Sequence, residues 1–246
     1  MLEGMYTAAA GMAAQQTRLD AVSANLANVD THGYKSARVA FRDLVYDDFQ
    51  GYGAQKGVEI GAGSAATSIG RSSEQGALQN TGRSLDVGLN GPGYIQVRLK
   101  DGKPALTRDG NLQVTPDGRL ATHTGQLLEP AITIPKDAKE DAITIKSDGT
   151  VQYDNKTLGQ IKLVDVPAPA GLKGGPDNTF VATTGSGAIR AANQATILTQ
   201  GTLEASNVDT AQAMTDMIEA QRAFQLASKA ITTQDQVLEI ANQVKR

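Results

Sequence analysis

Both ends of the chain carry a heptad repeat, and this pattern constrains the fold more than any other feature. The stretch 209–246 contains neither proline nor glycine. Its apolar residues recur seven apart at Met217, Phe224, Ile231 and Leu238, with a second row at Ala220, Ala227, Gln234 and Ala241. Such alternating steps of three and four residues predict a helix with one long packing seam.

The start of this C-terminal helix is also predicted by the sequence. Asp209 can accept hydrogen bonds from the free N–H groups of the first turn, and Gln212 completes a variant of the capping box. At 1.5 Å per residue the helix is roughly 50 Å long. A helix of that length extends beyond one small domain, so we expect a packing partner of similar length.

Residues 1–29 provide that partner. Their two rows are Met5, Met12, Leu19 and Leu26, and Ala8, Gln15, Val22 and Val29. We therefore predict an α+β protein, with long N- and C-terminal helices paired as a coiled coil around an inserted extended segment and an antiparallel all-β domain. Two ordinary core helices of one globular domain are the alternative that periodicity alone leaves open.

The helix faces away from the seams carry few charges, which favours assembly. The N-terminal helix is lined there by small residues such as Ala10, Ala14 and Ala21. The C-terminal helix has a second apolar stripe, made of Met214, Ile218, Val237, Ile240 and Val244. Because a helix facing water normally shows charged residues, we expect these helices to pack among several copies of the chain.

Composition limits the classes of function. The net charge is −3 and no basic block occurs, which argues against a nucleic-acid partner. No cysteine is present, so a disulfide framework and a thiolate metal site are excluded. No apolar run is long enough to cross a bilayer, so we expect no direct membrane insertion. The N-terminus lacks the pattern of a cleaved secretory leader.

The middle of the chain divides into two predicted parts. Residues 31–84 are glycine-rich and mixed in character, and we expect an extended linker or bridging segment. From Leu85 onward, short runs of alternating apolar residues predict an antiparallel β-domain, with irregular structure at 167–195. Hairpin turns are predicted at Asp101-Gly102, Asp109-Gly110, Asp117-Gly118 and Asp148-Gly149. The predicted domains are 1–30 with 205–246, then 31–84, then 85–204.

Sequence patterns at both ends resemble one protein family. The stretch Asn25-Leu26-Ala27-Asn28, followed by Thr31-His32-Gly33-Tyr34-Lys35, resembles the N-terminal signature of bacterial flagellar rod and hook proteins. The stretch Leu203–Asp209 and the later Glu219-Ala220-Gln221-Arg222 resemble the C-terminal signature of that family. Leu106–Asn111 is similar to the start of its first β-domain. A chain of 246 residues with one β-domain is similar in size to its rod subunits, since the hook protein is longer.

The resemblance implies a structural subunit of the flagellar basal-body rod. Such subunits polymerise into a helical tube that transmits torque and encloses an export channel. The implied partners are other copies of the chain, other rod and hook proteins, the flagellar type III export apparatus and envelope ring proteins. The implied location is the basal body in the cell envelope, in periplasm or cell wall, reached by export without a cleaved leader.

Two groups of residues are candidates for the assembly site. Subunit packing is predicted for Met5, Met12, Leu19, Val22, Leu26, Met217, Phe224, Ile231 and Leu238. The family signature, with a role in register, is predicted for Asn25, Asn28, Thr31, Gly33, Tyr34, Lys35, Ser206, Asn207, Gln221 and Arg222. For the asparagines, capping of helix ends is the alternative, while Gln15 and Gln234 on the seams fit a role in register.

An enzyme is not expected. The two histidines, His32 and His123, lack the spacing of a zinc site, and no cofactor motif follows the glycines at 88, 91 and 93. The four Asp-Gly pairs are interpreted as turns rather than acid–base carboxylates. We predict no catalytic residue, no metal and no cofactor. The second functional hypothesis is a secreted adhesion or binding module whose β-domain carries the ligand site and whose helices dimerise.

Overall fold

The computed structural model describes residues 2–44, 46–49, 58–61, 63–135, 138–192 and 196–244. Its chain divides into two compact units, each described by itself. The helical unit comprises Met1–Ala27, Ala37–Ile69 and Asp209–Arg246, and the β unit comprises Asn28–Ser36 and Gly70–Val208. Helices and antiparallel strands together make the chain α+β, as predicted. The predicted domain boundaries remain predictions.

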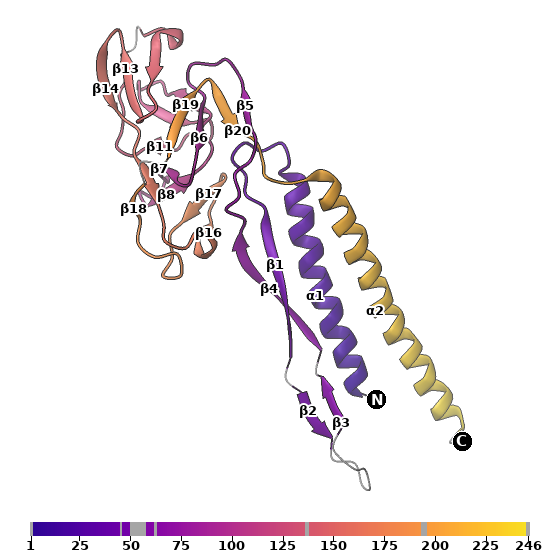
Figure 1. Cartoon of the computed structure of the whole chain (residues 1–246). Coiled ribbons are helices and arrows are strands. Elements are labelled where there is room, and N and C mark those ends of the chain that lie inside the picture. Colours follow the sequence, from indigo (N-terminus) through magenta and orange to yellow (C-terminus); the bar gives the residue numbers. More distant parts are fainter. Residues whose placement is uncertain are drawn as a thin grey trace. The chain divides into compact units, whose positions relative to one another are not determined.

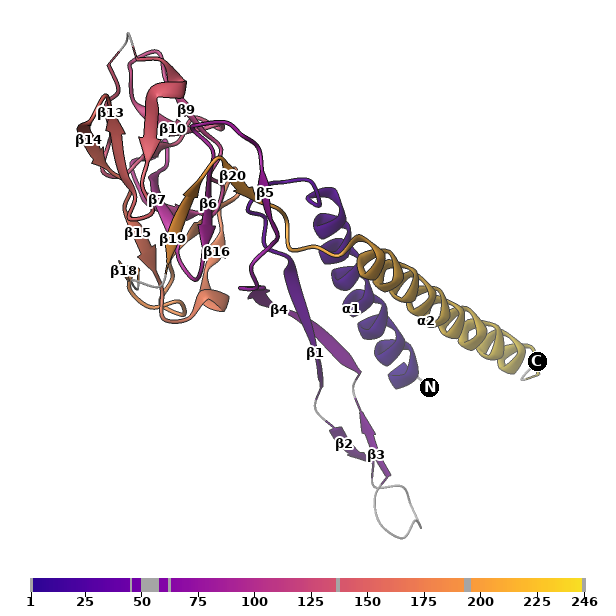
Figure 2. The same cartoon turned by 45° about the horizontal axis from the view of Figure 1, so that its top comes forward.

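The helical unit contains two helices, α1 (Leu2–Ala27) and α2 (Thr210–Val244), which lie side by side (Figures 1 and 2). The predicted cap is present, because Asp209 Oδ1 accepts the N–H groups of Ala211 and Gln212 at 2.9 and 3.2 Å. Gln212 differs from the prediction. Its side chain donates to Asp216 one turn further on instead of turning back toward Asp209.

Burial along α2 follows the heptad pattern. Ala220 is fully buried, and the other described seam residues of α2 are half-buried. The second stripe lies in solvent, with Met214, Ile218, Val237 and Ile240 each at least 50% exposed. On α1, Val22 is buried, and Met5, Met12, Leu19 and Leu26 are half-buried. One face of each helix is therefore covered, while the coiled-coil geometry stays a prediction.

A narrow strand ribbon completes the helical unit. Strand β1 (Ala37–Asp43) pairs with β4 (Ser64–Arg71), and β2 (Tyr46–Phe49) pairs antiparallel with β3 (Val58–Gly61). The ribbon runs along α1 (Figure 1). Gly63 has a φ of +103°, and a Cβ there would lie 3.1 Å from that of Ala10. The small residues of α1 therefore let the ribbon approach the helix closely.

The β unit is built from short antiparallel strands around two clusters of buried apolar residues, a larger one that includes Val87, Ile95 and Leu112 and a smaller one that includes Tyr94 and Phe180. In chain order they are β5 (Leu78–Asn80), β6 (Val87–Asn90), β7 (Tyr94–Arg98), β8 (Pro104–Thr107), β9 (Leu112–Val114), β10 (Leu120–Thr122), β11 (Leu127–Leu128), β12 (Ile143–Ile145), β13 (Thr150–Tyr153), β14 (Lys156–Gln160), β15 (Leu163–Asp165), β16 (Lys173–Gly174), β17 (Thr179–Val181), β18 (Arg190–Ala191), β19 (Ile197–Gln200) and β20 (Thr202–Glu204). Two 3-10 turns lie at Glu140–Ala142 and Pro169–Gly171.

The largest sheet has the order β16-β17-β8-β7-β11-β10-β9, with β15 pairing β7 and β18. Strands β12, β13 and β14 form a second sheet, while β19 pairs with β6 and β20 with β5. Three of the four predicted hairpin turns are confirmed, since β7 pairs with β8, β9 with β10 and β12 with β13.

The turn prediction at Asp109-Gly110 is wrong. The strands on either side of it, β8 and β9, do not pair with one another. The carbonyl of Gly110 instead accepts the N–H of Val87 at 3.0 Å, and a Cβ on Gly110 would lie 1.6 Å from the Val87 oxygen. The glycine therefore permits a close backbone crossing rather than a hairpin.

The segment 167–195 is also more regular than predicted. It contains β16, β17 and β18, and β17 joins the main sheet beside β8. Phe180 in β17 is buried against Tyr94, with the two rings edge to face. Strands of two or three residues are too short to produce a period-two pattern, which explains why the sequence did not predict them.

Candidate functional site: the helix surfaces and the meeting of the two signatures

The seam between α1 and α2 carries both apolar and polar contacts. Arg18 on α1 pairs with Asp216 at 3.2 Å and with Glu219 at 3.3 Å. Because all three side chains are partly exposed, each pair contributes at most about 1 kcal/mol. The predicted polar residue Gln15 lies on this seam, and its Oε1 is buried without a hydrogen-bond partner among the described residues. The Arg18 pairs and this polar group favour one alignment of the helices over others.

The outer face of α2 is apolar over much of its length. The exposed large apolar side chains on α2 are Met214, Ile218, Leu226, Val237 and Ile240. A shallow groove on this face is lined by Leu226, Lys229, Ala230, Thr233, Gln234 and Val237. The outer face of α1 carries exposed small residues, including Ala9, Ala13 and Ala24. A helix that faces water alone normally shows charges there, so these faces are suited to contact with another protein surface.

The two signatures meet inside the β unit. Gly33 donates its N–H to the Glu204 carbonyl at 2.8 Å, and Asn207 donates its N–H to the Tyr34 carbonyl at 3.3 Å. The Asn207 amide extends this contact, because Oδ1 accepts the Ser36 N–H at 2.8 Å and Nδ2 donates to the Glu74 carbonyl at 3.0 Å. Segments 33–36 and 204–207 therefore run beside each other, although they are far apart in sequence.

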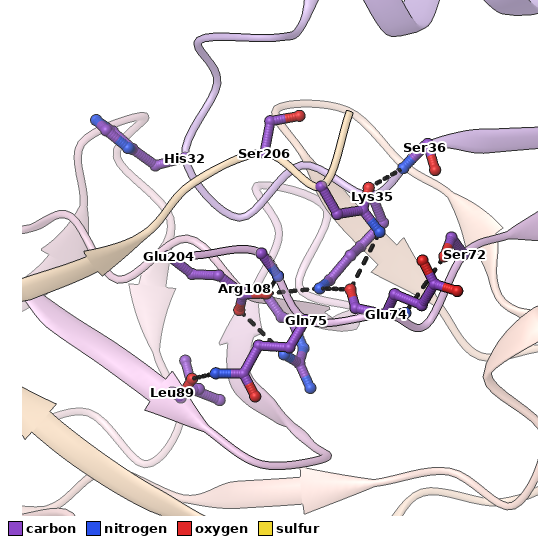
Figure 3. Close-up of polar contacts among 12 residues, drawn as sticks. His32, Lys35, Ser36, Ser72, Glu74, Gln75, Leu89, Arg108, Glu204 and Ser206 are labelled. Atoms are coloured by element: carbon purple, nitrogen blue, oxygen red, sulfur yellow. Dashed lines mark hydrogen bonds and ion pairs between the residues drawn. The ribbon is translucent and has the colours of Figure 1, made fainter. Parts of the chain in front are cut away.

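A buried group of three charged side chains lies at this meeting point. We call Lys35, Arg108 and Glu204 the ion cluster (Figure 3). Lys35 Nζ lies 2.6 Å from Glu204 Oε1, and Arg108 Nη1 lies 3.0 Å from Glu204 Oε2. None of the three side chains is more than 4% exposed. Charge-assisted bonds of this kind are among the stronger polar contacts in a protein.

Backbone groups complete the ion cluster. The N–H of Gly76 donates to Glu204 Oε1 at 2.8 Å, Lys35 Nζ also donates to the Glu74 carbonyl at 2.5 Å, and Arg108 Nη2 donates to the Gly91 carbonyl at 2.8 Å. Arg108 further stacks over the ring of Tyr94, with its guanidinium carbon 5.3 Å from the ring centroid. The single carboxylate thus holds two cations and one backbone N–H.

The pKa of Lys35 is lowered in the ion cluster. Burial is the main cause that lowers the pKa of Lys35 below its ordinary value of 10.5, and the nearby Arg108 adds to this effect. The bond to Glu204 opposes the decrease without cancelling it. Burial likewise raises the pKa of Tyr94 above its ordinary value. The cluster therefore depends on the Glu204 carboxylate, which faces both cations.

The predicted signature residues fall into different environments. Tyr34 and Lys35 are buried, and Gly33 is buried beside them. Arg71 covers the Tyr34 ring at 5.2 Å and donates to the Lys35 carbonyl at 2.9 Å. Thr31 Oγ1 donates to the Asn28 side chain at 3.2 Å, and the Ser206 hydroxyl accepts the Val208 N–H at 3.4 Å. Gln221 and Arg222 are exposed on α2.

The signature asparagines bind backbone groups within the chain. Asn25 Oδ1 accepts the N–H of Ala37 at 2.8 Å, and its Nδ2 donates to the Ala37 carbonyl at 3.1 Å, all within the helical unit. Asn207 makes the equivalent pair of contacts in the β unit. Each of these two amides thus bridges two chain segments, and capping of helix ends stays the alternative. The role of these asparagines in subunit register stays a prediction.

Sequence reasoning missed two members of the ion cluster. Arg108 and Glu204 stand inside the motifs that resemble the family, but no role was predicted for either. The available signal is local: a charged residue lies one or two positions after an apolar residue in Leu106-Thr107-Arg108 and in Leu203-Glu204. This pattern indicates a buried charge but cannot identify its partner, because Lys35 lies 169 positions from Glu204.

Asp109 and His123 form a second polar contact in the β unit. His123 Nδ1 lies 2.8 Å from Asp109 Oδ2, and the Asp109 side chain is 4% exposed while that of His123 is 52% exposed. Burial is the main cause that raises the pKa of Asp109, while the Asn111 N–H and His123 oppose it. Within the described part of the chain, no group of three His, Cys, Asp or Glu side chains could hold a metal ion. Neither described helix is apolar enough to span a membrane.

Comparison with known proteins agrees with this arrangement. Residues 5–35 match the family described as flagella basal body rod protein, residues 88–153 match the flagellar hook protein FlgE/F/G D1 domain, and residues 199–244 match the flagellar basal body rod FlgEFG protein C-terminal region. The three matches cover α1 with its signature, the first part of the β unit, and α2 with its signature. They fall in the same order along the chain as the resemblance predicted.

Full-length relatives carry the same family description. The flagellar basal-body rod protein FlgG of Caulobacter vibrioides is 38% identical over 99% of this chain and all of the relative. FlgG of Borreliella burgdorferi is 38% identical, and FlgG of Bacillus subtilis 37% identical, each over the full length of both chains. The chain therefore belongs to the flagellar basal-body rod protein family. This confirms the predicted family and the likeness of the chain to the distal rod protein.

Proposed function

We propose that this chain is the structural subunit of the distal rod of the flagellar basal body, which polymerises into a helical tube. The observation that carries the proposal is the apolar outer face of α2, where Leu226 is 69% exposed and Ile240 60% exposed. The full-length likeness to rod proteins supports the same function. The tube transmits torque and encloses the export channel. The minor proximal rod component is the alternative within the family.

Polymerisation and helix ordering are coupled in this proposal. An isolated helix in water is marginally stable, and fixing each residue costs roughly 1–2 kcal/mol of backbone entropy. The seam of α1 and α2 offsets part of this cost, but its described apolar residues other than Val22 and Ala220 are only half-buried within one chain. Burying a large apolar side chain completely contributes about 1.5–3 kcal/mol, so contacts with further copies make the ordered helices favourable.

The predicted site residues have two roles in this scheme. The helices pair as a coiled coil through Met5, Met12, Leu19, Val22, Leu26, Met217, Phe224, Ile231 and Leu238, and the seam stays packed when the outer faces meet other copies. The signature residues set the register of the subunits. The domains proposed are a terminal helical core of 1–30 with 205–246, a bridging segment of 31–84 and an outer β-domain of 85–204.

The proposed partners follow from the rod function. They are further copies of this chain, other rod and hook proteins, the flagellar type III export apparatus and envelope ring proteins. The proposed location is the basal body within the periplasm or cell wall, reached by flagellar type III export. We assign no enzymatic activity, cofactor, metal or nucleic-acid partner to the chain.

The experiment compares Ile218→Lys with Asp235→Lys in a flagellated strain that lacks its own distal rod gene. Both positions are exposed on α2. At about 3.6 residues per turn, Asp235 lies roughly 100° around the helix from Ile218 and therefore off the apolar face. We expect wild type and Asp235→Lys to restore swimming in soft agar and complete basal bodies in electron micrographs. Ile218→Lys should be exported yet fail to assemble, because a charge would be buried in the contact.

Two outcomes count against the proposal. Swimming restored equally by Ile218→Lys would show that the apolar face of α2 is not a subunit contact. A fixed dimer in sedimentation experiments, with no filaments at any concentration, would favour the adhesion or binding module instead. An open helical polymer has no such fixed stoichiometry, because its contacts do not close.

A further inference from the structure

The chain passes between its two units at four points, namely after residues 27, 36, 69 and 208. Three of the segments next to these points belong to the β unit: 28–36 follows α1, 70–77 begins with the last two residues of β4, and 203–208 precedes α2. We call them the connectors. Each connector contributes to the polar contacts around Glu204, through Lys35, through Gly76 and through Glu204 itself. The connectors of both terminal helices are thus joined at one carboxylate.

We infer that Glu204 is a positioning residue for rod assembly, which holds together, within the β unit, the two connectors that lead to α1 and to α2. No comparison assigns a role to this residue. The inference concerns how well ordered the connectors are within the β unit. Only its consequence for rod assembly rests on the proposed function. Lys35 and Arg108 act with Glu204, since they are the charged groups that its carboxylate binds.

The groups around Glu204 require both of its carboxylate oxygens to act as hydrogen-bond acceptors. Oε1 receives the Lys35 ammonium and the Gly76 N–H, and Oε2 receives the Arg108 guanidinium. A carboxylate is acceptor-only, whereas a glutamine side chain of the same shape has one oxygen and one NH2 group. Either orientation of that NH2 would face a donor, so Glu204→Gln breaks at least one bond without changing the volume. It also leaves two buried cations without a counter-charge.

Lys35 has a narrower part in the ion cluster. It is the side chain through which connector 28–36 reaches Glu204 and the Glu74 carbonyl. Lys35→Met keeps most of the buried volume and leaves the Arg108 and Gly76 bonds to Glu204 intact. This variant therefore loosens the first connector while the remaining Arg108–Glu204 pair stays balanced in charge. It serves as the milder test if Glu204→Gln does not fold.

The backbone contacts between connectors provide a direct readout. The N–H groups of Gly33, Ser36, Gly76 and Asn207 all bind groups of another connector. Their hydrogen exchange reports the order of the connectors, whereas exchange in β7 and β8 reports the stability of the β core. Substitution of a residue that only stabilises the unit as a whole would raise hydrogen exchange in both regions together. Substitution of a positioning residue raises exchange in the connectors more than in the β core.

The test is hydrogen–deuterium exchange with mass spectrometry on the full-length protein, for wild type, Glu204→Gln, Lys35→Met and the control Glu129→Gln. Glu129 forms a partly exposed ion pair with Arg98 in the same unit. We expect exchange in peptides covering 31–36 and 203–207 to be at least about tenfold faster in both cluster variants, with β7 and β8 unchanged in Lys35→Met. The control should match wild type throughout.

Two results would overturn the inference. One is unchanged exchange at the connectors in Lys35→Met, and the other is an equal increase at the connectors and in the β core. In the complemented strain, Lys35→Met should be exported but should reduce swimming, whereas Glu129→Gln should swim normally. Because exchange is measured on the purified protein, its outcome is separate from the rod assignment, which the wild-type complementation tests.

Discussion

The β unit and the helical unit bury their apolar side chains to different extents. Val87, Ile95, Val97 and Leu112 in the β core have no exposed surface. On α2, the described large residues of the outer stripe are half-exposed or more, and the described seam residues are half-buried except Ala220. Side chains that are fully buried within one chain stabilise that chain alone. The difference indicates that the β unit has a well-buried core of its own, and it agrees with the proposal that the helices complete their packing against other copies.

The largest expected effect is a cavity in the β core. Leu112→Ala should reduce the free energy of unfolding of the β unit by about 2–5 kcal/mol, because the side chain is fully enclosed. Urea unfolding followed by circular dichroism measures it. The matched change on α2, Leu226→Ala, should alter that free energy by less than about 0.5 kcal/mol, since Leu226 is largely exposed. Equal losses in both variants would remove the contrast between the units.

The cap of α2 is expected to have a smaller effect. Asp209→Ala removes the acceptor of two N–H groups and should weaken the start of the helix by about 0.5–2 kcal/mol. The measurement is the helical signal in far-ultraviolet circular dichroism at low temperature. Asp235→Ala, in the exposed middle of the same helix, should leave that signal equal or higher. A lower signal in both would trace the loss to charge rather than to capping.

A truncation on the seam separates monomer stability from assembly. Phe224 is half-buried within one chain. Phe224→Ala should lower the free energy of unfolding of the dilute protein by about 1 kcal/mol or less, because the helices are marginal there. The same change should strongly reduce the rods found in purified basal bodies. A decrease as large as that of Leu112→Ala would mean that the helices form a finished core in the monomer.

The smallest effect concerns the pH dependence of stability. The lowered pKa of Lys35 means that, between this value and 10.5, the unfolded chain binds more protons at Lys35 than the folded chain does. Stability should therefore rise with pH through that window. Urea midpoints measured between pH 7 and 9.5 should rise more in wild type than in Lys35→Met. The raised pKa of Tyr94 acts in the opposite direction at still higher pH, so the comparison stops below it.

Local patterns in the sequence predicted the helices and most turns. The heptads gave α1 and α2 to within a few residues, because seam and solvent alternate along a helix with a fixed period. Asp101-Gly102 and Asp148-Gly149 were placed correctly as hairpin turns, since their geometry depends on neighbouring residues alone. The predicted family was also correct, because the motifs that identify it are local sequence patterns, one at each end of the chain.

Contacts between distant residues could not be predicted from one sequence. Asp109-Gly110 has the composition of a hairpin turn, yet the packing of Gly110 against Val87 decides its conformation. Strands as short as β16 and β18 exist only because they pair with β17 and β15. The ion cluster requires contact between Lys35 and Glu204, which are separated in sequence by most of the β unit. In each case the deciding partner lies far away in sequence.

Limited proteolysis of the dilute full-length protein tests the central claim most directly. Arg18 on α1 and Arg222 and Lys229 on α2 provide sites for trypsin. If helix order depends on assembly, trypsin should remove both ends rapidly and leave a resistant fragment covering most of residues 70–208, as read by mass spectrometry. Protection of α1 and α2 in a monomer, to the same degree as the β core, would contradict coupled folding and assembly.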